Sequence, residues 1–211
     1  MPSSTTSRHS YHHGDLANAL TRAALELARA GGPDAVVLRA AARQLGVSAT
    51  AAYRHFSSRE DLLLAVKDCA LLELAERMQQ ELARVPAGGD TVTLLRARML
   101  ALGAGYIGFA LEQPGLFRTA FAHAEPMTGR HGIDPMQTVP FQMVVDTLDR
   151  LVAAGLIRAE RRPFLEVGAW ATAHGMAELL LDGPMRHMPA EVQQAAVARA
   201  LDMVVDGIMA G

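Results

Sequence analysis

Apolar residues recur at spacings of three and four along most of this chain, a pattern that predicts amphipathic helices. In the first such stretch Leu16, Leu20 and Leu27 fall on one face, and the Gly-Gly-Pro sequence at 31–33 then ends the helix. Similar runs, separated by Gly, Pro and polar residues, continue to the C-terminus. We expect about nine helices, at residues 14–30, 38–45, 48–56, 59–85, 91–112, 115–123, 134–154, 161–181 and 189–209.

The composition also favours an all-α fold. Apolar residues make up 50% of the chain, charged residues 20% and aromatic residues 5%, a balance typical of packed helices. No run approaches the eighteen or so apolar residues that span a bilayer, and the N-terminus lacks a secretory signal pattern. The single cysteine, Cys69, excludes an internal disulfide. We therefore expect a cytoplasmic protein with no membrane partner.

Charge is distributed unevenly along the chain. The net charge is −2, yet residues 1–60 hold seven Arg against four acidic residues, a net +3 that leaves −5 for the remainder. A basic head on an acidic body is what a protein needs when one end approaches phosphates.

The segment 38–56 has the pattern of a helix-turn-helix. Two short helical runs flank Gly46, a residue that can adopt the left-handed conformation that ends a helix. Small Ala42 lets the helices approach, and Ser48 can cap the second of them. We expect the small core to be closed by Leu45, Val47, Ala52 and Phe56. Because helical hairpins with glycine turns are common, this segment alone also fits a hairpin that binds no DNA.

Motifs on both sides of this segment resemble the TetR family of regulators. They are Tyr11-His-His-Gly-Asp-Leu16, Leu45-Gly-Val-Ser48, Ala52-Tyr-Arg-His-Phe56 and Ser58-Arg-Glu-Asp-Leu-Leu63, and the last two are similar to the family's Tyr-x-His-Phe, Lys/Arg-Glu-x-Leu-Leu signature. Ala169-Trp-Ala-Thr-Ala-His-Gly175 looks like the Trp-x-x-x-His-Gly pattern of one C-terminal subclass. Leu38 departs from the family, in which many members place a capping Ser or Thr there.

The resemblance implies a fold and a domain organisation. A flexible arm (1–13) and a three-helix helix-turn-helix head (14–60) would precede a linking helix and a larger helical body (61–211) for ligand binding and dimerisation. The protein would be a ligand-responsive transcriptional regulator, and repression is the usual behaviour of the family.

Direction along the third helix suggests which side chains meet DNA. Arg54 is the best candidate for reading a guanine, and the family uses an aromatic residue and a histidine at Tyr53 and His55 for backbone contacts. The alternatives are that Tyr53 packs inside the head and His55 is merely solvated. The expected DNA-binding residues are Arg39, Arg43, Ser48, Ala49, Thr50, Tyr53, Arg54, His55 and Arg59. Arg8, His12 and His13 form either an arm in an adjacent groove or an uninvolved tail.

A symmetric dimer would present two such helices about 34–36 Å apart, which matches successive major grooves. The operator is therefore expected to be an inverted repeat in double-stranded DNA.

The body is rich in Met and aromatic residues, most of which we expect to form plain core. Some should line an apolar cavity with a few polar groups, and for the polar candidates a structural role is an equal alternative. The expected ligand-binding residues are Tyr106, Phe109, Phe117, Phe121, Phe141, Trp170 and His174. Their apolar character favours a small hydrophobic or aromatic effector.

The last two helices are apolar enough to need a partner surface, and in the family they form a four-helix dimer bundle. The alternative is that they only close the core of one chain. Their apolar residues are Phe164, Val167, Leu179, Leu180, Val192, Ala195, Ala196, Leu201, Val204, Val205 and Ile208.

An enzyme and a protein-binding adaptor are the two alternatives to a DNA-binding regulator. An enzyme could use His174 and Glu178, or His123, His131 and Asp134, around a metal, but the chain has no His-Glu-x-x-His motif, phosphate-binding glycine loop or nucleophile elbow. We therefore expect no catalysis, cofactor or metal. A helical adaptor that binds only protein would differ in lacking salt-dependent DNA affinity.

Overall fold

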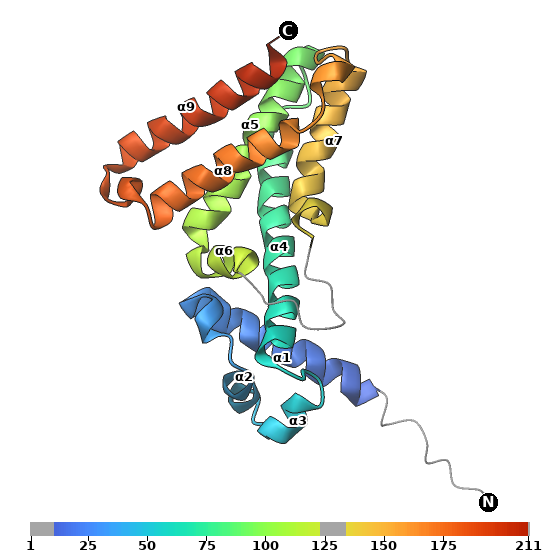
Figure 1. Cartoon of the computed structure of the whole chain (residues 1–211), viewed down its shortest axis with the longest axis vertical. Helices are drawn as coiled ribbons and strands as arrows, with labels where there is room; N and C mark the ends of the chain where they lie inside the picture. The colour runs from blue at the N-terminus through green and yellow to red at the C-terminus, as the bar shows by residue number, and fades with distance from the viewer. Residues whose placement is uncertain (1–10, 123–133, 211) are drawn as a thin grey trace, which may run out of the picture. The chain divides into compact units, whose positions relative to one another are not determined.

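A computed structural model describes residues 11–122 and 134–210. Over this part of the chain the structure is all-α, with nine α-helices and no strand, as the sequence predicts (Figure 1). The helices are α1 (Tyr11–Gly31), α2 (Leu38–Gln44), α3 (Ala49–Tyr53), α4 (Arg59–Arg84), α5 (Thr91–Glu112), α6 (Pro114–Phe121), α7 (Val139–Ala153), α8 (Leu165–Leu181) and α9 (Ala190–Met209). Short 3-10 turns lie at Pro33–Ala35, Pro135–Gln137, Ala159–Arg161 and Pro184–His187.

The chain forms two compact units, and the boundaries between them fall inside α4, after Ala70, and at the start of α6, before Gly115. The first unit holds α1, α2, α3, the beginning of α4 and α6. The second holds the rest of α4 together with α5, α7, α8 and α9. One unbroken helix, α4, therefore contributes residues to both units.

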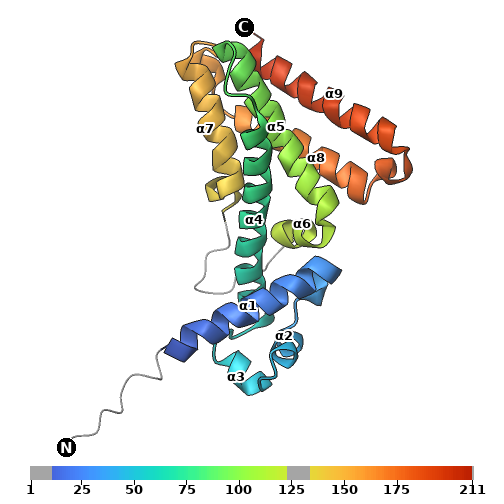
Figure 2. The ribbon, with the colours of Figure 1, turned by 180° about the vertical axis from the view of Figure 1, so that it is seen from behind.

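In the first unit α2 and α3 are short helices that pack against α1 (Figure 2). Leu20 and Ala24 of α1 are fully buried, as are Ala41 of α2 and Ala52 of α3. Of the residues expected to close this core, Ala52 and Phe56 are buried, Val47 is half-buried and Leu45 is 38% exposed. The small head core is therefore closed without Leu45.

The second unit is built around α5, which contacts α7, α8 and α9. By length and composition α5 is the one helix among the described residues that could cross a membrane, with a mean hydropathy of 1.3. The core helix of a protein that never meets a membrane passes the same test. Its apolar composition is explained by this central position, since Leu102, Tyr106 and Phe109 are all buried.

Two helices begin later than the periodicity indicates. The segment at 134 makes a 3-10 turn first, so that α7 begins at Val139. Before α8, Pro163 has no N–H to donate and Phe164 adopts a left-handed backbone with φ of 66°. Helix α8 therefore begins at Leu165. In contrast, α1 begins at Tyr11, three residues before the expected start at Gly14.

Candidate DNA-binding surface and ligand cavity

The turn between α2 and α3 is fixed by Gly46. This residue has φ of 68°, a conformation that costs little only for glycine. The N–H of Val47 donates to the carbonyl of Ala42 at 3.0 Å, and that of Gly46 donates to Arg43 at 3.2 Å. This pair of bonds is a Schellman motif, which ends α2 sharply and sets the direction of the chain into α3.

Helix α3 is capped by Ser48, as the sequence predicts. The Ser48 hydroxyl accepts a hydrogen bond from the N–H of Ala51 at 3.2 Å. Helix α2, in contrast, has Val37 at its N-cap position and no side-chain cap. Leu38, where the sequence comparison placed the missing cap, is the first residue of the helix and is buried.

The outer surface of this unit carries most of the residues expected to meet DNA. Their side chains contrast with those of Ala52 and Phe56, which are buried in the core. The exposed members are Arg39, Arg43, Ser48, Thr50, Tyr53 and Arg54, and Ala49 and His55 are half-buried. Three of the exposed residues are arginines, two on α2 and one, Arg54, directly after α3. Tyr53 is 46% exposed, so it is not a packed residue of the head.

Arg59 makes hydrogen bonds within the first unit. Its Nε donates to the carbonyl of Val36 at 3.1 Å, and its Nη2 donates to that of Pro33 at 2.6 Å. Nη2 also lies 3.6 Å from the carboxylate of Asp34. The guanidinium therefore ties the start of α4 to the turn before α2. Its side chain is still 40% exposed, and the phosphate contact expected of Arg59 stays a prediction.

The start of α4 is capped by Ser58, whose hydroxyl accepts from the N–H of Asp61 at 3.1 Å. The Asp61 carboxylate accepts in turn from the N–H of Ser57 at 3.1 Å and from the Ser57 hydroxyl. These bonds satisfy N–H groups that the first turn of a helix leaves without partners. Both caps of the head are therefore supplied by its own serines.

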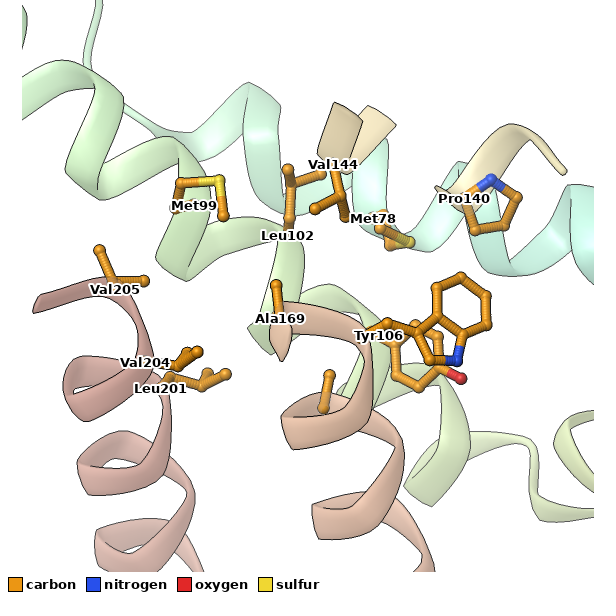
Figure 3. Close-up of a pocket in the computed structure, with 13 residues that line it drawn as sticks. Met78, Met99, Leu102, Tyr106, Pro140, Val144, Ala169, Leu201, Val204 and Val205 are labelled. Atoms are coloured by element: carbon orange, nitrogen blue, oxygen red, sulfur yellow. The ribbon is translucent and has the colours of Figure 1, made fainter. Parts of the chain in front are cut away.

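The second unit contains a small cavity of about 30 Å³ (Figure 3), room for about two water molecules. Its walls come from α4, α5, α7, α8 and α9. The lining residues are Met78, Met99, Leu102, Gly103, Tyr106, Pro140, Val144, Ala169, Trp170, Ala173, Leu201, Val204 and Val205. Almost all of them are apolar, as in many small-molecule sites.

A group of aromatic side chains surrounds one side of this cavity. The ring of Tyr106 meets that of Trp170 edge to face, with centroids 5.4 Å apart, and Phe141 lies 5.3 Å from Trp170 on the same measure. The Tyr106 hydroxyl is 2.8 Å from Nδ1 of His174, which makes a hydrogen bond. The structure thus brings together four of the seven expected ligand-binding residues.

Both members of this hydrogen bond are neutral near pH 7. Burial raises the pKa of the Tyr106 phenol well above its ordinary value, and the carboxylate of Glu178 raises it further. Burial lowers the pKa of His174, against a smaller opposing effect of Glu178.

Of the seven expected residues, Tyr106 and Trp170 line the cavity, and Phe141 and His174 contact these two without lining it. The other three are outside this group. Phe109 is buried elsewhere on α5. Phe117 and Phe121 belong to α6 in the first unit, where their ring centroids lie 5.0 Å apart. Aromatic composition alone does not distinguish a core residue from a residue of the cavity wall. The missed lining residues of α9, Leu201 and Val205, could have been found from helical phase.

Helices α8 and α9 lie side by side in the second unit (Figure 1). Some of their apolar residues are buried within the chain and others are exposed. Four of the residues expected at a dimer surface, Leu180, Leu201, Val205 and Ile208, are buried within the chain. The opposite face exposes Phe164, Val167, Leu179, Val192 and Met203, of which Phe164 (77%) and Met203 (61%) are the most exposed. Met203 was not among the expected residues.

No group of three or more His, Cys, Asp or Glu side chains that could hold a metal ion occurs among the described residues. His123 and His131, the loop residues of the metal alternative, lie outside the described residues, as does Arg8 of the arm.

Comparison with known families identifies the chain. Residues 20–66 match the family described as bacterial regulatory proteins, tetR family, and residues 99–204 match the tetracyclin repressor-like C-terminal domain. The chain therefore belongs to the TetR family of transcriptional regulators, with a helix-turn-helix DNA-binding domain and a ligand-binding C-terminal domain.

One relative, an uncharacterized HTH-type transcriptional regulator of Haemophilus influenzae, is 40% identical over 57 residues. This match covers 27% of the present chain and 28% of the relative.

Solved structures agree with this assignment over nearly the whole chain. A protein of unknown function from Rhodococcus sp. RHA1 superposes with a TM-score of 0.74 at 26% identity, covering 96% of this chain and 100% of that one. A TetR family regulator from Marinobacter aquaeolei VT8 gives 0.62 at 20% identity, covering 92% and 98%. TetR from Acinetobacter baumannii AYE, solved in complex with minocycline, gives 0.59 at 20% identity and covers 90% of each chain. The last two establish similarity of fold alone.

Proposed function

We propose that this protein is a homodimeric transcriptional repressor that binds an inverted-repeat operator in the cytoplasm and leaves it when a small hydrophobic effector enters the body. The observation that carries the proposal is the exposed basic surface on α2 and α3, in a member of a family of DNA-binding regulators. No enzymatic activity is part of the proposal.

Operator contact is assigned to the exposed residues of the helix-turn-helix. Ser48, Thr50, Tyr53 and Arg54 lie at the two ends of α3 or on its outer side, where side chains can reach base edges and phosphates. Arg54 reads guanine, since a guanidinium can bond two acceptors of that base at once. The arginines of α2, Arg39 and Arg43, together with Ala49 and His55, support the contact with the backbone.

Dimerisation is assigned to the exposed face of α8 and α9. Besides its exposed apolar side chains, this face contains Gly168, Gly175 and Gly207, where an added Cβ would meet nothing in the chain within 4 Å. Glycine inside a helix costs about 1 kcal/mol relative to alanine, a cost that a closely approaching second helix would explain. Two copies of the same face would cover each other around a twofold axis.

Helix α4 offers the physical connection for regulation. It carries Met78 in the cavity wall and Leu62 in the buried core of the first unit, with no interruption between Arg59 and Arg84. An effector acts only by binding one state more tightly than another. We propose that widening the cavity moves α4 and so changes the spacing of the two heads.

We also propose a division of the chain into functional domains and a C-terminal subclass. The domain division into an arm (1–13), a head (14–60) and a body (61–211) describes the functional parts. The Trp-x-x-x-His-Gly subclass pattern is relevant because its Trp170 and His174 both lie in the aromatic group beside the cavity.

The experiment compares Arg54→Ala with Arg150→Ala on duplexes selected from genomic DNA by the purified protein. Arg150 is an exposed arginine of α7, so both variants lose one positive charge. Arg54→Ala should weaken operator binding on the order of a hundredfold, because a lost base contact is worth about 1–3 kcal/mol and a dimer loses two. Arg150→Ala should bind as the wild type does. Equal affinities of the two folded variants in a gel-shift titration would contradict the assignment.

A further inference from the structure

The cavity walls carry no charged side chain. Of the thirteen lining residues, Tyr106 and Trp170 alone have a side-chain N or O atom. An ion that entered would lose its hydration and meet no opposite charge among the lining residues, which is unfavourable. An uncharged ligand loses far less. Glu178, whose carboxylate acts on Tyr106 and His174, is not one of the lining residues.

At the polar side of the cavity, the donor and the acceptor of the hydrogen bond between Tyr106 and His174 can be assigned. Tyr106 and His174 are both neutral, and their 2.8 Å bond holds one proton between oxygen and nitrogen. A phenol O–H is a better donor than an imidazole N–H, and an imidazole nitrogen is a better acceptor than a phenol oxygen. Tyr106 therefore donates to His174. A phenol oxygen carries two lone pairs besides its proton, so a ligand that brings a donor suits it.

The shape of the walls favours an aromatic ligand. Trp170 stands between Tyr106 and Phe141 with interplanar angles of 66° and 51°, tilted arrangements that a further ring can join edge to face. The cavity of about 30 Å³ must widen to admit a ring. Met78 and Met99 in its walls have flexible side chains that can change rotamer to make room.

We propose that the effector is an uncharged, mainly aromatic molecule with one hydroxyl or N–H group, which donates a hydrogen bond to the Tyr106 hydroxyl. This assignment rests on the proposed function for its biological meaning, but the binding chemistry can be tested without DNA.

Trp170 is the single tryptophan of the chain, so its fluorescence reports directly on the cavity. The test titrates the full-length protein with four probes of one shape: para-ethylphenol, para-ethylanisole, para-ethylbenzoate and para-ethylbenzylamine. The phenol is a neutral donor, the anisole is neutral without a donor, and the last two are an anion and a cation near pH 7. We expect the phenol to bind about tenfold more tightly than the anisole. The two ions should bind at least about a hundredfold more weakly than the phenol.

Tyr106→Phe keeps the ring and removes the hydroxyl. In this variant the phenol should lose its advantage, while the anisole binds as tightly as before. Tyr11→Phe, the same change at the start of α1 in the first unit, is the matched control and should preserve the full selectivity. Thermal unfolding of each variant confirms that it folds.

Equal affinities of phenol and anisole in the wild type, preference for either ion, or no response to any of the four probes would overturn the proposal. Operator binding is measured separately. Normal operator binding with no probe selectivity would count against the effector class alone, and correct probe selectivity without operator binding would count against the proposed function.

Discussion

Helices α3 and α9 expose different kinds of side chain: those exposed at α3 are mainly polar, and α9 exposes apolar ones. Helix α3 is capped by its own Ser48 and turns Thr50 outward, followed by exposed Arg54. Helix α9 buries Leu201 on one side and leaves Met203 61% exposed on the other. Polar exposed groups are stable in water and ready for phosphates, whereas an exposed apolar stripe is stable only when covered. The contrast teaches that the two units are built for different partners.

The largest expected effect comes from placing a charge on the apolar face. Met203→Glu should raise the dimer dissociation constant on the order of a hundredfold or more, because two like charges would meet near a twofold axis. Sedimentation velocity over a dilution series measures the change. Met136→Glu, at an exposed methionine of the turn before α7, is the control. A variant that stays dimeric at the lowest measurable concentration would show that this face is not the dimer surface.

In the interior of the second unit, α4 and α5 should pack too closely to accept an added methyl group. A Cβ on Gly105 would lie 2.6 Å from the Cα of Met78 in α4, where backbone must move to make room. Gly105→Ala should therefore lower the free energy of unfolding by about 2 kcal/mol. Gly88→Ala, where an added Cβ has open space, should change it little. Denaturant unfolding compares the two, and equal stabilities would contradict the close approach of α4 and α5.

Loss of the Ser48 cap of α3 should have a moderate effect on the free energy of unfolding. Ser48→Ala removes the acceptor for the N–H of Ala51 and should cost about 1 kcal/mol in the free energy of unfolding. Thr50→Ala, on the exposed surface of the same helix, should cost much less. Thermal unfolding measures both variants. If Thr50→Ala is the more destabilising, the cap is not what holds the start of α3.

The smallest expected effect is a pH dependence in the second unit. Burial depresses the pKa of His174 below its ordinary 6.5, so the unfolded chain binds a proton more readily than the folded one. Stability is therefore lost progressively as pH falls below about 6.5 and through the folded pKa. His174→Gln should flatten this part of the curve, whereas His187→Gln, at an exposed histidine, should not. Parallel curves for wild type and His174→Gln would contradict the burial of a neutral imidazole.

The sequence predicts the two units unequally. Around Gly46 and Ser48 local chemistry decides the structure, because a left-handed glycine and a capping serine act within a few residues. In the body, periodicity predicts each helix but not its neighbours. Leu201 and Met203 are both apolar residues of α9, yet one lines the cavity and the other is exposed. That distinction depends on helix packing between distant segments.

Arg59 shows a second limit of sequence reasoning. A basic residue next to a helix-turn-helix predicts a phosphate contact, and for Arg59 this stays a prediction. The sequence does not reveal that its guanidinium also bonds the carbonyls of Pro33 and Val36. The partners lie more than twenty residues away in the chain, and carbonyl acceptors leave no trace in the sequence. The missed cavity residue Met78 is similar, since a methionine on a long helix is ordinary core until its neighbours are known.

We propose that two copies of this chain hold one duplex through α3. Sedimentation of the protein with a duplex selected from genomic DNA, at several salt concentrations, measures both the number of chains bound and the salt dependence of binding. We expect an even number of chains on each operator, and an affinity that falls steeply as salt rises because bound phosphates release counterions. A protein that remains monomeric and binds no duplex even at low salt would contradict it.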